Sequence, residues 1–393
     1  MGYEEQAPHR RADYASVKLL LATPYYAPAW FFGGPVAVAH TMVEDLLAMG
    51  HDVTVATTDA QDARDRLPHD TPPMPSGAEV LRFPNLSHRL ATGAMAWQPR
   101  GYRGWVKQNV GRFDACLGHD FYSVISAAGA PAAAAAGTPW VLQPLGSLAP
   151  STERGRPLLK RAFLAGPGRA TLRASAAYVV STRREREDFA AVGADPGKLR
   201  EIPLPLDIPG PAPDTPRATV PTLVCVARLD PIKGIDRLLE ALALARRSVP
   251  DLRLELIGPG ESAPFRARAQ RLGIADAVDF RGFISPEEKR VALTRAHAVC
   301  LFSRSEGLPL AAIEAMACGT PVVISEGTNL PEADEVAGVV FDGTPEAGAE
   351  AIVALMGDAA LREHLGDGAH EFAARFDRAA VMPRMEALFR ELA

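Results

Sequence analysis

The sequence alternates short apolar runs with stretches of helix-forming residues along almost its whole length. In the first half, apolar runs recur at residues 17–22, 51–57, 80–83, 115–117, 140–142 and 178–180. After a proline-rich stretch the alternation restarts, with runs at 223–227, 252–257, 278–280, 299–302, 322–324 and 339–341. Near-continuous apolar strands that alternate with helices are typical of parallel sheets covered on both faces. The pattern therefore predicts an α/β fold with two Rossmann-like domains that face each other across a cleft.

The two series also set the domain boundaries, because 393 residues exceed what one ordinary core holds. We expect residues 16–205 to form the first domain and residues 206–375 to form the second. Residues 1–15 are expected to be a flexible tail, and residues 376–393 to be a final helix. The proline-rich stretch at 203–221 would connect the two domains.

The bulk composition narrows the classes of function. A net charge of −5 and the lack of a nucleic-acid-binding motif argue against a nucleic-acid partner. No apolar run reaches the roughly eighteen residues of a membrane span, and the polar start does not resemble a signal peptide, so we expect a cytoplasmic protein. The four cysteines are far apart, which is typical of reduced thiols in a core. Because no HExxH motif or His/Cys cluster is present, we expect no bound metal.

The segment that starts at Ser305 contains two glutamates, Glu306 and Glu314, eight positions apart. Glu306 follows the apolar run at 299–302. Glu314 lies inside a helix that is expected to start near Pro309 and to end at Gly319. The free N–H groups of that helix would open between the two carboxylates and form an anion site. A nucleotide-sugar matches this layout, because it has a sugar, a diphosphate and a ribose in that order.

Two cations follow the first strand of the second half. Arg228 and Lys233 lie on a predicted strand-to-helix loop, at the sheet edge where ligands bind in open α/β folds. Solvated charges on a loop are the alternative explanation. Arginine can grip a diphosphate with two hydrogen bonds and lysine supplies a point charge, so together with the two glutamates the pair favours a binding role.

Two features of the first half could face the same cleft. Gly33 and Gly34 end a long aromatic loop after the first strand, and paired glycines let the backbone approach a ligand closely. A tight turn would explain them equally well. His119 follows the predicted strand at 115–117, and its place at the carboxyl end of a strand favours a functional role over a structural one. No GxGxxG motif is present, which removes the main support for NAD chemistry.

Two basic stretches remain. Residues 80–113 contain no acidic residue, and Trp97, Tyr102 and Trp105 alternate with basic residues in this range. The basic residues are Arg82, Arg89, Arg100, Arg103, Lys107 and Arg112. Residues 154–173 contain a second basic group, Arg154, Arg156, Lys160, Arg161 and Arg169. A solvated surface is the simpler interpretation. The alternative is peripheral contact with an anionic membrane, at the inner face of the plasma membrane, or with a phosphorylated acceptor.

These motifs resemble those of the family 4 glycosyltransferases, which have the GT-B architecture, over nearly the whole chain. The segment from Glu306 to Glu314 is similar to the EX7E signature of that family, and Arg228 with Lys233 and Gly234 is similar to its cationic pair. Two segments depart from the family pattern. Pro144-Leu145-Gly146 stands where many members of the family have Pro-His-Gly. Residues 204–207 replace the common motif Asn-Gly-x-Asp. Both departures leave the identity of the acceptor undetermined.

The resemblance implies a role for each matched residue. Arg228 and Lys233 would hold the donor diphosphate, Glu306 the sugar hydroxyls and Glu314 the ribose hydroxyls. The backbone of residues 307–310 (Gly307, Leu308, Pro309 and Leu310) would contact phosphate or sugar, and Phe283 and Ile284 would lie beside the base. Gly33 and Gly34 match the first-domain glycine loop of the family. His119 matches a histidine that touches donor sugar and acceptor. In this architecture the final helix, 376–393, crosses back to the first domain.

The implied activity is transfer of a sugar, with retention of configuration and without metal or cofactor, from a UDP- or GDP-sugar to a hydroxyl acceptor. The acceptor could be a lipid-linked saccharide, a polysaccharide or a natural product. A nucleotide-sugar 2-epimerase and a non-catalytic nucleotide-sugar-binding protein remain alternatives. A glycosidase is disfavoured, because its paired carboxylates lie within about 9.5 Å and we expect a greater separation here.

Overall fold

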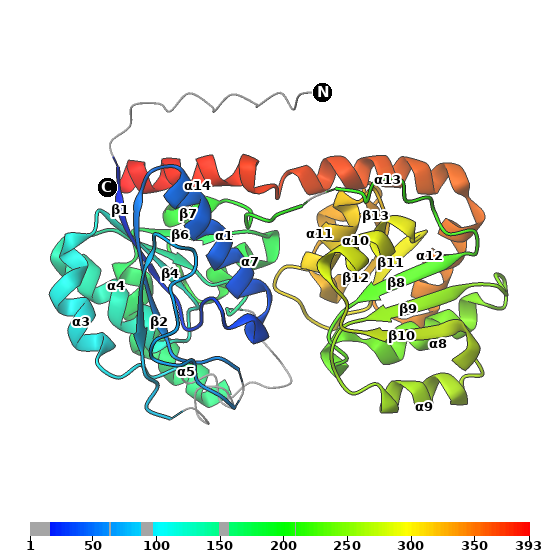
Figure 1. The fold of residues 1–393 in the computed structure, drawn as a ribbon, viewed down its shortest axis with the longest axis horizontal. Coiled ribbons are helices and arrows are strands. Elements are labelled where there is room, and N and C mark those ends of the chain that lie inside the picture. The colour runs from blue at the N-terminus through cyan, green and yellow to red at the C-terminus, as the bar shows by residue number, and fades with distance from the viewer. Residues whose placement is uncertain (1–15, 63, 88–96, 149–156, 209) are drawn as a thin grey trace.

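Figure 1 shows the computed structural model, which describes residues 16–62, 64–87, 97–148, 157–208 and 210–393. Two α/β domains lie side by side, each built on one parallel sheet. The predicted fold class is therefore confirmed. The predicted tail at 1–15 lies outside the described residues.

The first sheet has the strand order β3-β2-β1-β4-β5-β6-β7, and every pair in it is parallel. Its strands are β1 (Lys18–Ala22), β2 (Asp52–Thr58), β3 (Glu79–Phe83), β4 (Ala115–His119), β5 (Trp140–Gln143), β6 (Ala177–Val180) and β7 (Leu199–Glu201). The edge strand β7 was not predicted. It has three residues, two of them charged, so it produces no apolar run.

Helices cover both faces of this sheet, as the alternation along β1 shows. Leu19 and Leu21 belong to one buried cluster, whereas Leu20 and Ala22 belong to another. Both sets must be apolar because successive side chains of a strand point to opposite faces. The helices are α1 (Gly34–Ala48), α3 (Tyr102–Asn109), α4 (Val124–Ala136), α5 (Pro157–Ala165), α6 (Pro167–Ala174) and α7 (Arg183–Ala191).

The second sheet has the order β10-β9-β8-β11-β12-β13 and is also parallel. Its strands are β8 (Thr222–Val226), β9 (Arg253–Ile257), β10 (Val278–Gly282), β11 (Ala298–Leu301), β12 (Val322–Ser325) and β13 (Gly338–Phe341). The helices are α8 (Ile235–Ala245), α9 (Ala263–Arg271), α10 (Pro286–Arg295), α11 (Leu310–Ala317), α12 (Pro345–Gly357) and α13 (Ala359–Ala374).

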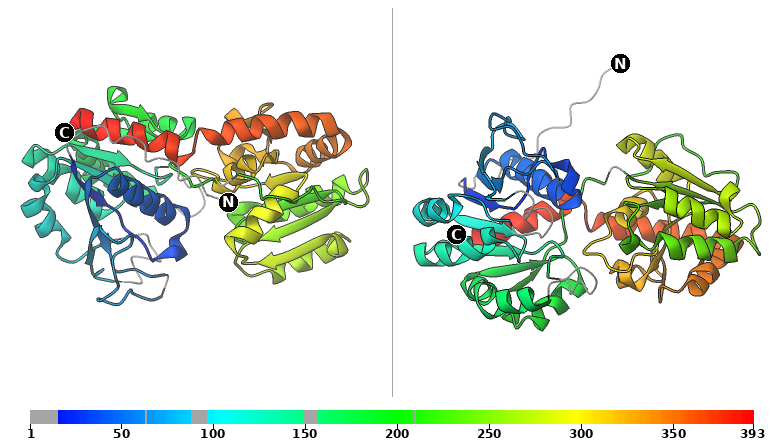
Figure 2. Two further views of the ribbon diagram at one scale, coloured as in Figure 1. Left: turned by 45° about the horizontal axis from the view of Figure 1, so that its top comes forward. Right: turned by 90° about the horizontal axis from the view of Figure 1, so that it is seen from below.

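The last helix, α14 (Arg378–Leu392), leaves the second domain and lies against α1 of the first, so that the C-terminus ends beside β1 (Figures 1 and 2). The guanidinium of Arg378 fixes this contact, because it lies 2.6 Å from the carboxylate of Asp45 on α1. Val381, Met385 and Phe389 of the same helix are buried. The final helix is therefore anchored to the first domain by both charge and packing.

Candidate active site

The strand order of each sheet reverses at one position, between β1 and β4 in the first domain and between β8 and β11 in the second. In open parallel sheets, ligands bind beyond the carboxyl ends of the strands at such a switch point. The loops that follow β8 and β11 contain the two cations and the first glutamate identified from sequence. These residues therefore lie where the topology of the second domain favours a ligand.

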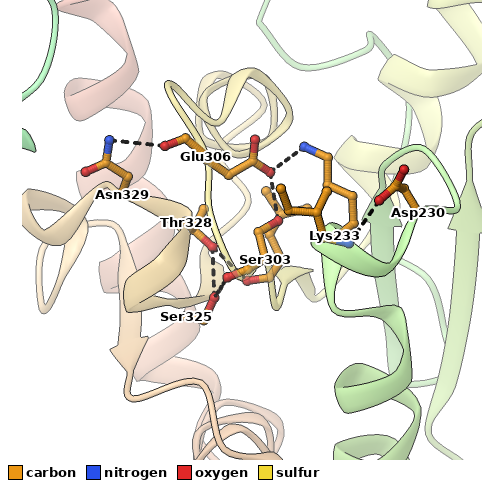
Figure 3. Close-up of polar contacts among 9 residues, drawn as sticks. Asp230, Lys233, Ser303, Glu306, Ser325, Thr328 and Asn329 are labelled. Carbon is orange, nitrogen blue, oxygen red and sulfur yellow. Dashed lines mark hydrogen bonds and ion pairs between the residues drawn. The ribbon is translucent and has the colours of Figure 1, made fainter. Parts of the chain in front are cut away.

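Lys233, Ser303 and Glu306 form the centre of this site (Figure 3). Lys233 ends a 3-10 turn, Pro231–Lys233, and its Nζ donates to Oε1 of Glu306 at 2.6 Å. The hydroxyl of Ser303 donates to the same oxygen at 2.7 Å. The Lys233 and Glu306 side chains are only 19% and 12% exposed. Among the described residues none donates to the second oxygen of Glu306, so that oxygen can accept from a ligand.

Backbone contacts hold the two loops together. Gly234 has a φ of 62°, and a Cβ there would overlap the carbonyl oxygen of Phe302, so this close approach requires glycine. The amide of Arg304 donates to the carbonyl of Ile232 at 2.8 Å. The guanidinium of Arg304 binds the carboxylate of Asp236 with hydrogen bonds of 3.0 and 2.7 Å. The loops, and the ion pair between them, are therefore fixed relative to each other.

Arg228 lies on the same loop as Lys233 but outside the ion-pair cluster. Its side chain is exposed, and within the part of the chain that the structure describes it has no ion-pair partner. An exposed guanidinium can bind a phosphate with two parallel hydrogen bonds. The structure thus brings the predicted cations to one loop, where one is neutralised by Glu306 and the other faces solvent.

The second predicted glutamate is held by a different lysine. Glu314 lies in α11, and Nζ of Lys289, from α10, donates to both of its carboxylate oxygens at 2.7 Å. The two side chains are 30% and 29% exposed, so the pair is accessible to a ligand from the surface. Glu306 and Glu314 therefore belong to two separate ion pairs, the first before α11 in the sequence and the second within it.

The segment between the glutamates offers its main chain to a ligand. Helix α11 begins at Leu310, and Pro309 occupies the N-cap without a side-chain capping bond. The side chains of Leu308 and Leu310 are half-buried and pack on the core of the second domain. That the backbone of residues 307–310 binds an anion at this helix N-terminus stays a prediction.

Polar side chains beneath the site support its backbone. The amide nitrogen of Asn329 donates to the carbonyl oxygens of Gly307 at 2.9 Å and Glu306 at 3.4 Å (Figure 3). Ser325 donates to the carbonyl of Ser303 at 2.7 Å and lies 3.1 Å from the hydroxyl of Thr328. These contacts fix the loop that contains Glu306 from the side opposite to the ion pair.

The first domain reaches this site through glycines. A Cβ built on Gly34 would lie 2.6 Å from Cδ1 of Leu310, at the start of α11. The neighbouring Gly33 has a φ of 71°, a conformation that favours glycine. The glycine loop predicted to form part of the cleft therefore contacts the second domain where the proposed anion site opens.

His119 is the last residue of β4, and its side chain lies in the interior rather than open to solvent. It is 1% exposed, and its Nε2 lies 3.1 Å from Oε1 of Gln143 on β5. Burial lowers the pKa of His119 to about 4, so the imidazole is neutral at pH 7. Its Nδ1 is buried without a partner in the described part of the chain. Contact with a substrate stays a prediction for this residue.

The predicted base-binding segment lies between β10 and α10. Phe283 is 82% exposed, whereas Ile284 is half-buried and packs against the core. A large aromatic ring that gains nothing from burial is available to stack on a planar ligand. The position at the carboxyl end of β10 is at the same edge of the sheet as Lys233.

The basic stretches divide into core and surface. Trp97 and Tyr102 are fully buried and Trp105 is half-buried, and all three rings pack against other residues of the first domain. Several basic side chains are exposed, namely Arg100, Arg103, Lys107, Arg112, Arg161 and Arg169. Arg89, Arg154 and Arg156 lie outside the described residues. Membrane contact stays a prediction. Across the described residues, no helix is long and apolar enough to span a membrane.

Two further observations concern the described residues as a whole. Among them, no group of three side chains is suited to hold a metal. A hollow of about 770 Å³ opens beside His297 and Gly319, which precede β11 and β12 and so lie at the opposite edge of the second sheet. Arg217 lines it, but its guanidinium donates to the carbonyls of Thr294 and Gly319 and is already satisfied.

Sequence reasoning missed Lys289, Ser303 and Asn329. Lys289 is one of many surface cations, and nothing at its own position links it to Glu314, which lies 25 residues away. Asn329 has a φ of 64°, and an asparagine after a predicted strand is a usable signal for a left-handed turn. Ser303 could have been found from its place between the end of β11 and Glu306.

Two family models match most of the chain. The model described as glycosyl transferase 4-like domain matches residues 33–205. The model described as glycosyl transferases group 1 matches residues 213–372. The first match includes the glycine loop and His119, and the second includes both ion pairs.

Curated relatives match over part of the chain. The D-inositol 3-phosphate glycosyltransferase of Segniliparus rotundus is 35% identical over 173 residues, which are 42% of this chain and 38% of the relative. The GDP-mannose-dependent alpha-(1-6)-phosphatidylinositol monomannoside mannosyltransferase of Mycolicibacterium smegmatis is 34% identical over 200 residues, which are 45% of this chain and 51% of the relative. The chain thus spans about half the length of the curated relatives it matches.

Solved structures share the fold over nearly the whole chain. HepE of Anabaena, crystallised with UDP, is similar with a TM-score of 0.78 and 19% identity, over 95% of this chain and 100% of that chain. Sucrose-phosphate synthase of Thermosynechococcus elongatus is similar with a TM-score of 0.71 and 21% identity, over 96% and 99% of the two chains. These likenesses concern the arrangement of the two domains.

Proposed function

The chain belongs to the family 4 glycosyltransferases of the GT-B fold, and on that premise we propose that it transfers a sugar from a nucleoside-diphosphate sugar to a hydroxyl group. The observation that carries the proposal is the cluster of Lys233, Ser303 and Glu306 at the switch point of the second domain. It combines a cation for phosphate with a carboxylate oxygen that can accept from a sugar hydroxyl. Such a pair suits a ligand that is charged at one point and hydroxylated beside it.

The charge of the leaving group explains the cations. As the bond between sugar and diphosphate breaks, negative charge grows on the phosphate, and fixed positive groups lower the free energy of that transition state. Arg228, Lys233 and the N-terminus of α11 surround the position where we place the diphosphate. They would supply the charge that a divalent ion supplies elsewhere, so we propose that the reaction needs no metal.

We expect the anomeric configuration of the sugar to be retained. Glu306 is engaged by Lys233 and Ser303 through one oxygen, and its role in this proposal is to bind hydroxyls rather than to form a covalent intermediate. The acceptor oxygen would then attack from the side of the departing phosphate, which accepts the acceptor's proton. The stereochemistry of the product, measured by NMR, tests this step.

The relatives indicate which substrates to test first. The printed name of the Mycolicibacterium smegmatis relative includes GDP-mannose, and HepE was crystallised with UDP. UDP- and GDP-sugars are therefore the donors we propose. Several relatives are named for inositol 3-phosphate or phosphatidylinositol mannoside, so a phosphorylated polyol or a phospholipid-linked saccharide is the first acceptor class to test.

Alanine substitution of Glu306, Arg228 or Lys233 tests the site. A charge-assisted hydrogen bond is worth roughly 1.5–3 kcal/mol, so each variant should lose about tenfold to a hundredfold in kcat/KM. The measurement is transfer from UDP- and GDP-sugars, followed by mass spectrometry, with and without EDTA. We expect equal rates in the two conditions.

Arg247→Ala is the matched control, because Arg247 is exposed and follows the far end of α8. It should keep wild-type activity, and circular dichroism should show that all four variants are folded. Wild-type turnover in the three site variants would contradict the assignment. Incubation with donor alone separates the alternatives, because an epimerase would equilibrate the sugar whereas a transferase gives at most slow hydrolysis.

A further inference from the structure

Two glycines from different domains meet beside the centre of the site. A Cβ built on Gly146 would lie 2.8 Å from the Cα of Gly307, and one built on Gly307 would lie 3.1 Å from the Cα of Gly146. Main chain therefore packs directly on main chain, and no side chain larger than hydrogen fits between them. Gly307 directly follows Glu306. This contact between the two domains is thus one residue from the carboxylate that we propose binds the sugar.

Glu185, on α7, holds the first-domain side of this contact. Its side chain is buried, with the residue 4% exposed. One carboxylate oxygen accepts from the amide of Gly146 and the other from the amide of Ser181, both at 2.7 Å. Leu145 has a φ of 51°, and a left-handed residue other than glycine persists only where its surroundings hold it. Gly146 has a φ of 78°, which glycine adopts freely. Because burying a carboxylate costs free energy, its use here indicates that the position of this turn matters.

Asn329 holds the second-domain side. Its side-chain amide donates to the carbonyl of Gly307 at 2.9 Å and to that of Glu306 at 3.4 Å. Its own backbone has a φ of 64°, a left-handed conformation that asparagine tolerates better than most residues. Each facing glycine is therefore fixed from behind by one polar side chain of its own domain.

We propose that Glu185 and Asn329 are positioning residues. They fix the contact between Gly146 and Gly307, which limits how closely the two domains approach each other. The inference rests on the proposed transfer reaction. The contact between Gly146 and Gly307 would set the distance between an acceptor bound on the first domain and the sugar bound at Glu306. Reacting atoms must come within about 3–3.5 Å, and a misplacement of roughly 1 Å can cost a hundredfold in rate.

The test separates positioning from donor binding. Glu185→Gln keeps the shape of the side chain but turns one acceptor into an N–H donor that faces a backbone amide. Asn329→Gly removes both donors and keeps a residue that tolerates positive φ. Gly146→Ala adds a methyl group at the contact itself. Each variant should lower kcat between about tenfold and a hundredfold, while the Kd for the donor nucleotide, measured by calorimetry, stays within about twofold.

A matched control comes from the same helix. Asp188 is also 4% exposed, and it pairs with Arg184 rather than with the Gly146 turn. Asp188→Asn should keep wild-type kcat. If Glu185 and Asn329 act on one contact, the double variant Glu185→Gln/Asn329→Gly should lose less than the product of the two single losses. Urea unfolding of every variant shows whether the fold is kept.

Three results would overturn the proposal: wild-type kcat in the folded variants, a Kd that rises in step with the loss of kcat, or independent multiplicative losses in the double variant. Failure of the proposed function gives a different result. In that case the wild-type chain itself would neither bind a UDP- or GDP-sugar nor transfer its sugar. If Glu185→Gln does not fold, Gly146→Ala and Asn329→Gly still decide the outcome.

Discussion

At the scale of single residues, a lysine neutralises each of the two glutamates of the candidate site. Glu306 is paired with Lys233, and Glu314 with Lys289. A partly buried carboxylate without a partner would be costly, and the lysine hydrogen bonds satisfy and orient both carboxylates. The two pairs differ in one respect. Lys233 lies on the loop proposed to bind phosphate, whereas Lys289 contacts only the carboxylate proposed to bind ribose.

This difference predicts that Lys289 contributes less to donor binding than Glu314 does. Accessible ion pairs are worth up to about 1 kcal/mol, so Lys289→Met should raise the donor Kd by no more than about fivefold. Glu314→Ala removes the charge-assisted hydrogen bonds that we propose Glu314 makes to ribose, and it should raise the donor Kd by about tenfold or more. The double variant should match Glu314→Ala alone, as measured by calorimetry. A larger effect of Lys289→Met than of Glu314→Ala would show that Lys289 contacts the donor directly.

His119 and Asp120 predict opposing contributions to the pH dependence of stability. Burial lowers the pKa of His119 from 6.5 to about 4, so between these values the unfolded chain binds more protons and acid destabilises the fold. Burial raises the pKa of Asp120 from 3.8 to about 6, so in that range the folded chain binds more protons and acid stabilises it. Each contribution amounts to about 3 kcal/mol at its limit.

The variants separate the two contributions. As the pH falls from 7 to 4.5, the unfolding free energy of His119→Gln should rise relative to that of the wild type. The reason is that the variant lacks the buried imidazole whose lowered pKa makes acid destabilise the wild-type fold. Asp120→Asn should lose unfolding free energy over the same range. Urea unfolding at several pH values measures both. Curves for the two variants that run parallel to wild type would contradict the buried environment of these side chains.

At the scale of elements, the loop between β10 and α10 shows how structure adds to a sequence pattern. Ser285 and Glu288 form a capping box that fixes the start of α10. The preceding Phe283 is left 82% exposed. The helix is thus anchored independently of Phe283, whose ring is free to serve a ligand.

Phe283→Ala should therefore weaken donor binding without affecting the fold. Stacking of a base on an aromatic ring is worth about 1–3 kcal/mol, so the Kd for a UDP- or GDP-sugar should rise by about fivefold or more. The unfolding free energy should change by less than about 0.5 kcal/mol, because little area is buried. Leu158→Ala, at a residue 78% exposed on α5, is the control and should change neither quantity. An unchanged Kd in Phe283→Ala would place the base elsewhere.

Elements and short motifs could be predicted from the sequence because their signals are local. Continuous apolar runs predicted the parallel sheets, and Pro309 and Gly319 predicted the bounds of the helix that contains Glu314. Contacts between distant segments could not be predicted. Glu185 lies 39 residues from Gly146, and no pattern at either position indicates their hydrogen bond. The burial of His119 likewise depends on how β4 and β5 pack.

At the scale of the whole molecule, the chain crosses between the domains at two places that lie side by side. Leu206, in the proline-rich connector, receives a hydrogen bond from Arg378 at 2.9 Å and donates to Phe376 at 2.8 Å. Beyond this point α14 is tied to the first domain, where Glu386 lies 3.2 Å from His51. A rotation about the paired crossings would move the second domain while α14 stays with the first. Hinges of this kind absorb the motion in a few terminal residues of elements.

We therefore predict that the two domains close on the donor. The close contacts of Gly34 with Leu310 and of Gly146 with Gly307 describe a closed arrangement. Without ligand, hydration of the exposed Arg228 guanidinium favours a more open arrangement, and a diphosphate bound between the domains would compensate for its loss. Small-angle scattering with a UDP- or GDP-sugar should match the structure, and scattering without it should give a larger radius of gyration. Lys233→Ala, which should bind the donor poorly, is the control and should stay expanded. Identical scattering with and without a donor that calorimetry shows to be bound would rule out closure about these crossings.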